Sequence, residues 1–262
     1  MAIVNWNTAD AALAAARAYL ASAGVEARVT IVDNDSRPEQ QELLRAGCPR
    51  DVRLDLREEN VGYGTAANLA LRDGDGELVC ISNADVLPDP DALAALAEVA
   101  GQPRAGMVGP VFGGDTDRYH AALPGAATML VRIFAGSFGE RPQPSPAPGE
   151  VTEVGQPSGA CFVVRRELWE RLGGFDEGFF LWYEDVDLAQ RMRDDGHRNL
   201  VAGDARVGHI GAEAFAQVDS RRQQAIRLRS VERYIRLHHR RMAPIAAPLL
   251  RLSRRLRAGG AR

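Results

Sequence analysis

Short apolar runs alternate with helix-like stretches through residues 2–112, and this alternation limits the possible folds more than any other feature. Each run is short enough for one buried strand, and each intervening stretch is long enough for a helix. The runs cover residues 3–4, 28–32, 52–56, 77–81 and 107–112. This pattern is typical of βα units, so the sequence predicts an α/β fold with a mainly parallel sheet flanked by helices.

Residues 113–157 interrupt the alternation. Gly113 and Gly114 open this segment, and proline at positions 142, 144, 146 and 148 disfavours both helix and central strand, so we expect a variable surface loop. Regular structure resumes with a strand at 160–164 and helices at 166–172 and 184–195. We therefore expect a single domain over residues 1–215, divided into 1–112, the loop 113–157, and 158–215.

The chain has a basic C-terminal segment on an acidic body. Its net charge is −3 and all 32 basic residues are arginine; residues 221–262 hold 13 of them against one acid, Glu232. This segment therefore carries about +12 and residues 1–220 about −15. A helical extension over 216–262 is predicted, with an apolar stripe formed by Leu228, Val231, Ile235 and Met242.

Three interpretations of this extension stay open: a helix packed on the domain, a basic surface held on anionic lipid, or a contact between copies in a homodimer. No apolar run approaches the length of a membrane span, and no secretory signal is recognised. The cysteines Cys48, Cys80 and Cys161 lack the spacing of a zinc or redox site. We expect a cytoplasmic protein that contacts the inner face of the membrane at most peripherally.

Polar clusters follow three of the predicted strands. They are Asn5-Trp6-Asn7, Asp33-Asn34-Asp35-Ser36 and Asn83-Ala84-Asp85. Each cluster alone is explained by turns and helix caps. In an open parallel sheet, however, ligands bind outside the carboxyl ends of the strands, and three such clusters at one edge indicate a binding site.

The segment 60–68 places Gly62 and Gly64 at the start of a predicted helix. Such a Gly-x-Gly lets the backbone approach a phosphate or ribose. The chain contains no lysine, which excludes a P-loop, and Ala67 stands where a dinucleotide fingerprint has its third glycine. A nicotinamide cofactor is therefore disfavoured.

Residues 173–187 combine five carboxylates with five aromatic rings. Acids at the start of a helix and rings in a core explain part of this set. The remainder is typical of a sugar or nucleotide pocket with a general base. His209, after the apolar segment 205–207, is by itself a structural histidine, but with Asp85 and diphosphate oxygens it could hold Mn²⁺ or Mg²⁺.

Seven motifs in this order closely resemble glycosyltransferase family 2, most of all its rhamnosyltransferase-like branch. They are Ile-Val-Asn-Trp-Asn-Thr (3–8), Val-Asp-Asn-x-Ser (32–36), Asn-x-Gly-Tyr-Gly-x-Ala-x-Asn (60–68), Asn-Ala-Asp (83–85), Ser-Gly-Ala-Cys-Phe-x-Val-Arg-Arg (158–166), Gly-Gly-Phe-Asp-Glu-x-Phe-Phe (173–180) and Glu-Asp-Val-Asp-Leu-x-x-Arg (184–191). The resemblance covers residues 2–211. It implies a Rossmann-like GT-A domain that inverts the anomeric carbon.

The resemblance also implies roles for individual residues. Donor binding falls to Asn5, Trp6, Asp33, Asn34, Gly62, Asn68, Asn83 and Asp85; metal binding to Asp85 and His209; acceptor binding to Ser158, Gly159, Trp182 and Glu184; and the catalytic base to Asp185. Residues 1–112 would then bind the nucleotide sugar and 158–215 the acceptor. Asn83 departs from the family pattern, since many members have Asp there, which weakens the expected Mn²⁺ or Mg²⁺ site.

The expected reaction moves a hexose or deoxyhexose from a dTDP or UDP donor, with dTDP-L-rhamnose the best guess, to a hydroxyl of a glycan, lipid-linked or natural-product acceptor. A nucleotidylyltransferase that forms sugar nucleotides is an alternative. Such an enzyme needs a basic, glycine-rich loop after the first strand, where Asn5-Trp6-Asn7-Thr8 stands instead. A nucleic-acid-binding protein is suggested only by the arginines of the extension, and the acidic body argues against it.

Overall fold

The computed structural model describes residues 1–262 except 114–119, 126–127, 130–140, 210–219, 247 and 251–262. The side chain of His209 also lies outside the described part. The helices are α1 (Ala9–Leu20), α2 (Pro38–Gly47), α3 (Tyr63–Leu71), α4 (Ala92–Ala100), α6 (Arg166–Arg171), α7 (Glu184–Asp194) and α9 (Ser220–His238). The strands are β1 (Ala2–Asn5), β2 (Val29–Asp33), β3 (Val52–Leu56), β4 (Leu78–Asn83), β5 (Val86–Pro88), β6 (Ala105–Phe112), β7 (His120–Ala121), β8 (Pro142–Gln143), β9 (Val151–Glu153), β10 (Cys161–Arg165) and β11 (Arg198–His209).

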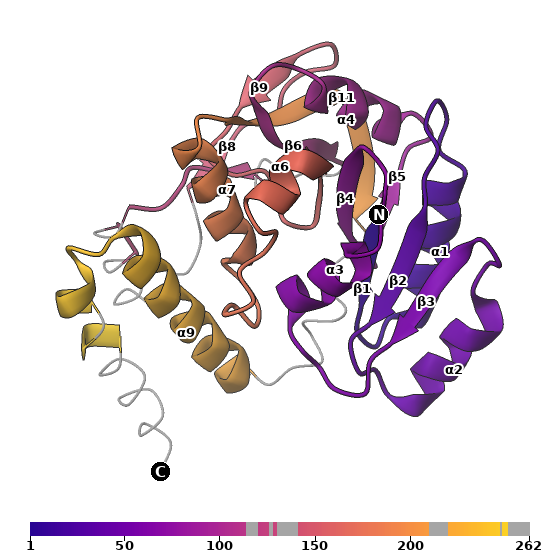
Figure 1. The fold of residues 1–262 in the computed structure, drawn as a ribbon, viewed down its shortest axis with the longest axis horizontal. Coiled ribbons are helices and arrows are strands. Elements are labelled where there is room, and N and C mark those ends of the chain that lie inside the picture. Colours follow the sequence, from indigo (N-terminus) through magenta and orange to yellow (C-terminus); the bar gives the residue numbers. More distant parts are fainter. Residues whose placement is uncertain (114–119, 126–127, 130–140, 210–219, 247, 251–262) are drawn as a thin grey trace.

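The main sheet has the strand order β3-β2-β1-β4-β10-β6-β11-β5, and β9 pairs with β11 beside this path. Strands β3, β2, β1 and β4 are parallel to one another. Strand β10 is antiparallel to both of its neighbours, and β6 and β11 return to the direction of β1. The expected α/β fold with a mainly parallel sheet flanked by helices is confirmed (Figure 1).

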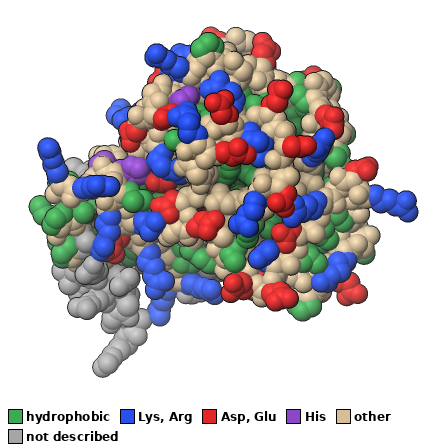
Figure 2. Space-filling model, in the orientation of Figure 1, with side chains coloured by type: hydrophobic (Ala, Val, Ile, Leu, Met, Phe, Trp, Pro, Cys, Tyr) green, Lys and Arg blue, Asp and Glu red, His purple; other side chains and the backbone are tan. Residues whose placement is uncertain are grey.

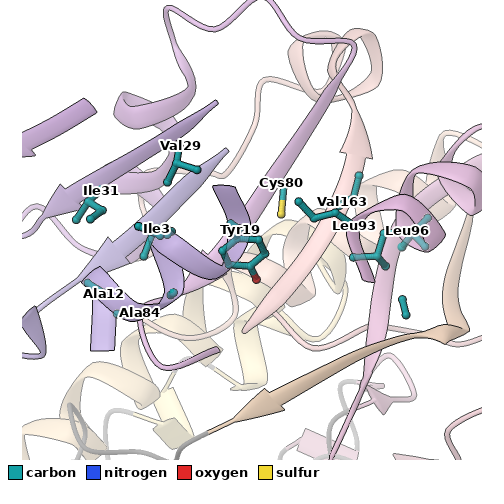
Figure 3. Packing of buried hydrophobic residues seen from close by; sticks show 14 of the residues in the cluster. Ile3, Ala12, Tyr19, Val29, Ile31, Cys80, Ala84, Leu93, Leu96 and Val163 are labelled. Atoms are coloured by element: carbon teal, nitrogen blue, oxygen red, sulfur yellow. The ribbon is translucent and has the colours of Figure 1, made fainter. Parts of the chain in front are cut away.

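Helices cover both faces of this sheet, which gives three layers. On one face, α1 and α4 bury apolar side chains against the strands; Tyr19 of α1 is fully buried there and donates a 2.9 Å hydrogen bond to Ser82 on β4 (Figure 3). On the other face, α3, α6 and α7 enclose a second core that includes Phe162, Trp169 and Phe175. The edge-on packing of Trp169 and Phe162 against the ring of Phe175 fixes the segment that leads to α7.

Several strands differ from the sequence-based expectations. The strand β5, which ends at Pro88, is not among the predicted apolar runs, and it is an edge strand that pairs with β11. The segment 113–157, expected as a surface loop, contains β7, β8 and β9 within its described residues, and His120 of β7 is buried. Proline is compatible with these strands because each lies at an edge, where one row of backbone groups needs no partner strand.

Helix α9 packs on the body of the domain. Leu228, Val231 and Ile235 of the predicted apolar stripe are buried together with Tyr234, against Phe179 and Tyr183 of the loop before α7. Met242, the fourth residue of that stripe, lies in a turn beyond the end of α9 and is half-buried. Figure 2 shows arginine side chains over the surface of this region. Among the described residues, no helix is both long enough and apolar enough to cross a membrane.

Candidate active site

Three polar segments meet at the carboxyl ends of neighbouring parallel strands. Asn5 at the end of β1 is in register with Asp33 at the end of β2, and Val4 is in register with Asn83 at the end of β4. They border a pocket that is lined by Val4, Asn5, Trp6, Thr8, Asn34, Asn60, Gly62, Tyr63, Asn83, Ala84, Asp85, Phe180, Leu181, Trp182, Arg222, Gln223 and Ile226. This is the place where an open α/β sheet binds ligands.

A buried hydrogen-bond network around Asp33 holds Asn5 at the edge of the pocket. The Asp33 carboxylate accepts hydrogen bonds from the side chains of Asn5 at 2.7 Å, Gln41 at 3.0 Å and Ser36 at 2.5 Å. Asp33 is fully buried and does not line the pocket. Its carboxylate instead fixes the amide of Asn5, which does line the pocket, so Asp33 acts through its neighbour.

A second network holds the wall formed by Asn34 and the glycine loop. The Asn34 side chain donates to Asn60 at 3.1 Å and accepts the backbone N–H of Val61 at 2.9 Å. Asn60 in turn accepts the backbone N–H of Gly62. These bonds anchor the loop before α3 to the end of β2, so both segments present a fixed surface to a ligand.

Gly62 allows the loop before α3 to touch the loop before α7. Its φ is +90°, a left-handed conformation, and a Cβ there would collide with the backbone of Phe180. The next residue, Tyr63, donates its backbone N–H to the Phe180 carbonyl at 2.9 Å. Trp182 and Tyr183 also have positive φ values, 64° and 73°, and such strained residues cluster at functional sites.

Asp85 and the backbone of His209 lie next to each other. Asp85 is in the turn between β4 and β5, and the register pairs His209 of β11 with Val86. The side chain of His209 is outside the described residues. Asp85 and Asn83 both line the pocket, and among the described residues no group of three or more acid, histidine or cysteine side chains could hold a metal.

Asp185 is held at the start of α7 from three directions. Its Oδ2 accepts hydrogen bonds from the Gln156 side chain at 2.6 Å and from the Gly159 backbone at 3.1 Å, and its Oδ1 accepts from Val186 at 2.8 Å. Asp185 is half-buried as a residue, and its carboxylate accepts all three of these hydrogen bonds. Burial raises the pKa of Asp185 and outweighs the hydrogen bonds that lower it.

Glu184 is buried beside Asp185, and its Oε2 has no hydrogen-bond partner. Burial raises the pKa of Glu184 well above its usual range, and the charge of Asp185 adds to this shift. Burial likewise raises the pKa of Tyr63, and the charges of Glu184, Asp185 and, to a smaller extent, Asp85 raise it further. The hydroxyl of Tyr63 donates a 3.2 Å hydrogen bond to the Gly159 carbonyl, so the pocket wall is connected to the residue that binds Asp185.

Other residues expected at the site hold structure instead of lining the pocket. The Asn68 side chain donates to the Phe175 carbonyl at 2.9 Å and accepts the Phe175 N–H at 3.0 Å, which ties α3 to the loop before α7. Ser158 accepts the N–H of Ala160, and Gly159 accepts the Tyr63 hydroxyl at its carbonyl. Of the predicted acceptor residues, Trp182 is the one that lines the pocket.

The five carboxylates of 173–187 divide into two groups. Asp176 pairs with Arg233 of α9, Glu177 accepts from Asn68, and Asp187 pairs with Arg191 and His238. These three stabilise the surrounding structure. Glu184 and Asp185, the other two, are neighbours in the first turn of α7.

Sequence reasoning missed several residues at the site. Asn60 and Tyr63 were in a recognised motif without a role, and Gln156 was in the segment expected to be loop. The extension, which carried no motif, supplies Arg222, Gln223 and Ile226 to the pocket wall. No pattern of hydrophobicity marks these three, because their place depends on how α9 packs.

Comparisons with known proteins agree with this geometry. The model of the family described as "Glycosyltransferase like family 2" matches residues 1–227. N-acetylglucosaminyl-diphospho-decaprenol L-rhamnosyltransferase of Mycobacterium tuberculosis is 31% identical over 215 residues, which are 71% of this chain and 67% of that protein. O-antigen biosynthesis protein RfbC of Myxococcus xanthus is 32% identical over 189 residues, 68% of this chain but 14% of RfbC.

Solved structures share the fold at low sequence identity. GalNAc-T7 with UDP, GalNAc and Mn²⁺ superposes with a TM-score of 0.64 at 19% identity, covering 90% of this chain and 47% of the other. Mannosyltransferase PcManGT of Pyrobaculum calidifontis, with GDP-Man and Mn²⁺, has a TM-score of 0.62 at 21% identity, covering 100% and 75%. The fold is therefore GT-A, and the chain belongs to glycosyltransferase family 2, in its rhamnosyltransferase-like branch.

Proposed function

We propose that this glycosyltransferase moves a hexose or deoxyhexose from a nucleoside diphosphate to an acceptor hydroxyl with inversion. The observation that carries the proposal is the position of Tyr63, which lines the pocket and donates its hydroxyl to the carbonyl of Gly159 at 3.2 Å, while the N–H of Gly159 binds Asp185. The pocket, with Asn5, Trp6 and Asn34, would hold the nucleoside, and Asp185 would act beside it as the base. Similarity to two proteins whose names concern rhamnose transfer or O-antigen supports dTDP-L-rhamnose as the first donor to test.

In the proposed step, Asp185 takes the proton of the acceptor hydroxyl while the oxygen of that hydroxyl forms a bond to the anomeric carbon. The bond from that carbon to the diphosphate oxygen breaks on the opposite face, and the nucleoside diphosphate leaves with the electron pair. The raised pKa of Asp185 makes it a stronger base than an ordinary aspartate. The donors from Gln156 and Gly159 fix its orientation, and such positioning supplies much of the acceleration.

A divalent cation, Mn²⁺ or Mg²⁺, is part of this proposal. Asp85 lines the pocket, and the pairing of β5 with β11 brings the backbone of His209 beside it. These two residues would hold the ion together with diphosphate oxygens, and oxygen and imidazole ligands suit either metal. When bound, the cation would neutralise charge that develops on the leaving group. Asn83 supplies a neutral amide where a second carboxylate would bind the ion more strongly.

The proposed acceptor is a glycan, a lipid-linked sugar or a natural product, bound on the side of residues 158–215. A lipid-linked acceptor would agree with a membrane-facing surface on the extension, formed by Arg236, Leu237, Arg240, Arg241 and Ile245. These five side chains are exposed, and Ile245 is 59% accessible. Binding of full-length protein to vesicles that contain anionic lipid, but not to neutral vesicles, would support this membrane contact. Recovery of equal amounts of protein with both kinds of vesicle would contradict it.

Binding and turnover test the central proposal. Thermal stability is measured with dTDP, UDP and GDP, each with and without Mn²⁺, and consumption of dTDP-L-rhamnose and other nucleotide sugars is then followed with simple glycan acceptors. We expect one nucleoside diphosphate to stabilise the protein most, and the product to have the inverted anomeric configuration by NMR. Absence of stabilisation by every nucleoside diphosphate, or retention of configuration, would contradict the proposal.

A further inference from the structure

The pocket is lined by two charged side chains of opposite sign. Among the described lining residues these are Asp85, from the turn after β4, and Arg222, from the first turn of α9. A nucleoside diphosphate sugar brings two negative charges on its diphosphate. Asp85 alone would repel that group, so a cationic partner in the same pocket matters for binding.

Helix α9 is fastened to the loop that forms the adjacent wall of the pocket. The guanidinium of Arg227 stacks over the Trp182 ring at 4.5 Å, and the Ser230 hydroxyl donates a 2.8 Å hydrogen bond to the Leu181 carbonyl. Leu181 and Trp182 both line the pocket. The turns of α9 that follow Arg222 are thus held against Leu181 and Trp182, which line the same pocket as Arg222.

Contacts further along α9 keep this arrangement independent of Arg222. The Arg233 guanidinium binds the Asp176 carboxylate with hydrogen bonds of 2.7 to 3.0 Å, and Leu228, Val231 and Ile235 are buried against the domain. Arg222 itself is exposed toward the pocket side of the helix and belongs to no buried cluster. When Arg222 is replaced, these contacts of the later turns should still hold α9 on the domain.

We propose that Arg222 binds the diphosphate of the donor, so that the C-terminal extension forms part of the donor site. The inference rests on the proposed function, since it names the residue that meets the leaving group. Arginine suits this role because its planar guanidinium can donate two parallel hydrogen bonds to phosphate oxygens. Together with a cation at Asp85, the guanidinium would supply positive charge to the diphosphate. This charge matters because Asn83, in place of a second acid, weakens the binding of that cation.

The test compares nucleotide and nucleoside binding in matched variants. Affinities for the nucleoside diphosphate that stabilises the wild-type protein most, and for the corresponding nucleoside, are measured by calorimetry with Arg222→Ala, Arg222→Lys and Arg229→Ala. Arg229 lies on the same helix, is exposed, and is outside the pocket. We expect Arg222→Ala to lose about tenfold to a hundredfold in diphosphate affinity with nucleoside affinity unchanged. Arg222→Lys should lose less, and Arg229→Ala should equal wild type.

Three results would overturn the assignment. Equal diphosphate affinity in Arg222→Ala and wild type would exclude the contact, and equal losses in Arg222→Ala and Arg229→Ala would reduce it to a general charge effect. A parallel loss of nucleoside affinity would mean that Arg222 shapes the pocket without binding phosphate. Each of these leaves the proposed function standing, provided that wild type binds the nucleotide and transfers sugar. Failure of wild type to bind any nucleoside diphosphate would contradict both the assignment of Arg222 and the proposed function.

Discussion

The Gln156 side chain donates a 2.6 Å hydrogen bond to Oδ2 of Asp185. Gln156 is itself buried and follows β9, in the segment 113–157, whereas Asp185 lies in the first turn of α7. The orientation of the proposed base is therefore set by a residue that the family motifs do not include. The segment 113–157, which lies outside the seven motifs, in this way contacts the proposed base directly.

Replacing Asp185 with Asn should abolish most of the transfer while leaving the donor bound. Asn is nearly isosteric but cannot take a proton, and a general base contributes about 10²- to 10⁴-fold to a rate. We expect kcat to fall within that range, with nucleotide affinity close to wild type. Measurement of both quantities on one preparation separates the two effects, and near-normal turnover would exclude Asp185 as the base.

Replacing Gly159 with Ala should impair turnover by displacing the base. A Cβ at this position would collide with the Asp185 carboxylate, which the Gly159 N–H also binds. We expect kcat to fall at least about tenfold, because a small misplacement of a catalytic group costs much of its effect. Gly125→Ala is the matched control, since a Cβ there meets no atom of the described residues within 4 Å. Similar kinetics in the two variants would contradict this role of Gly159.

The pH dependence of stability should reveal the proton on Glu184. Its pKa is raised in the folded protein, so the folded state binds more protons than the unfolded state between the ordinary glutamate pKa and the raised value. Stability therefore falls as the pH rises through that window. Glu184→Gln, which resembles the protonated acid, should flatten this decline and be the more stable protein at its upper end. Denaturant unfolding across the pH range measures the difference, and identical profiles would contradict a raised pKa.

The dependence of kcat/KM on pH should show the raised pKa of Asp185 on the acidic side of the profile. Transfer needs the ionised carboxylate, and the pKa of Asp185 is raised by burial. The value of kcat/KM should therefore rise with pH through a midpoint above about 3.9, the value for an unperturbed aspartate. A midpoint at or below that value would mean that the hydrogen bonds from Gln156 and Gly159 outweigh burial.

Loss of the Arg233–Asp176 pair should weaken the attachment of α9. Burial alone would raise the pKa of Asp176, but hydrogen bonds from Arg233 and Gly178 lower it overall. The pair therefore stabilises the protein above the ordinary aspartate pKa, and that contribution disappears as the pH falls through the lowered value. Because the pair is partly exposed, we expect Arg233→Ala to cost about 1 kcal/mol at neutral pH. Chemical denaturation at pH 7 and near pH 3 checks both the size and the direction.

The sequence predicted the parts of the fold that depend on local pattern. The polar ends of β1, β2 and β4 could be identified because parallel strands bring their carboxyl ends to one edge, and the register of Asn5 with Asp33 confirms that convergence. The apolar stripe of Leu228, Val231 and Ile235 followed from helical periodicity, and those residues are buried.

The remaining features depend on contacts between distant segments. The edge strand β5 is only three residues long, and its partner β11 lies more than a hundred residues away, so local pattern gave little sign of it. Asp33 and Asn68 have side chains of the kind that often bind ligands. Here they form hydrogen bonds within the protein, with the side chain of Asn5 and the backbone of Phe175. Periodicity shows which face of α9 is buried, but not that Arg222 at its start reaches a pocket.

The position of β11 has a consequence for synthesis of the protein. This strand ends at residue 209, yet it lies between β6 and β5, and β5 directly follows the turn that carries Asp85. On the ribosome, the N-terminal strands can pair early, but β5 has no neighbour in the main sheet until β11 has been translated. The nascent chain must therefore carry an incomplete sheet edge for more than a hundred residues, and such an edge is prone to association with other chains. The turn that carries Asp85 can therefore be fixed by the pairing of β5 with β11 only after residue 209 has been made.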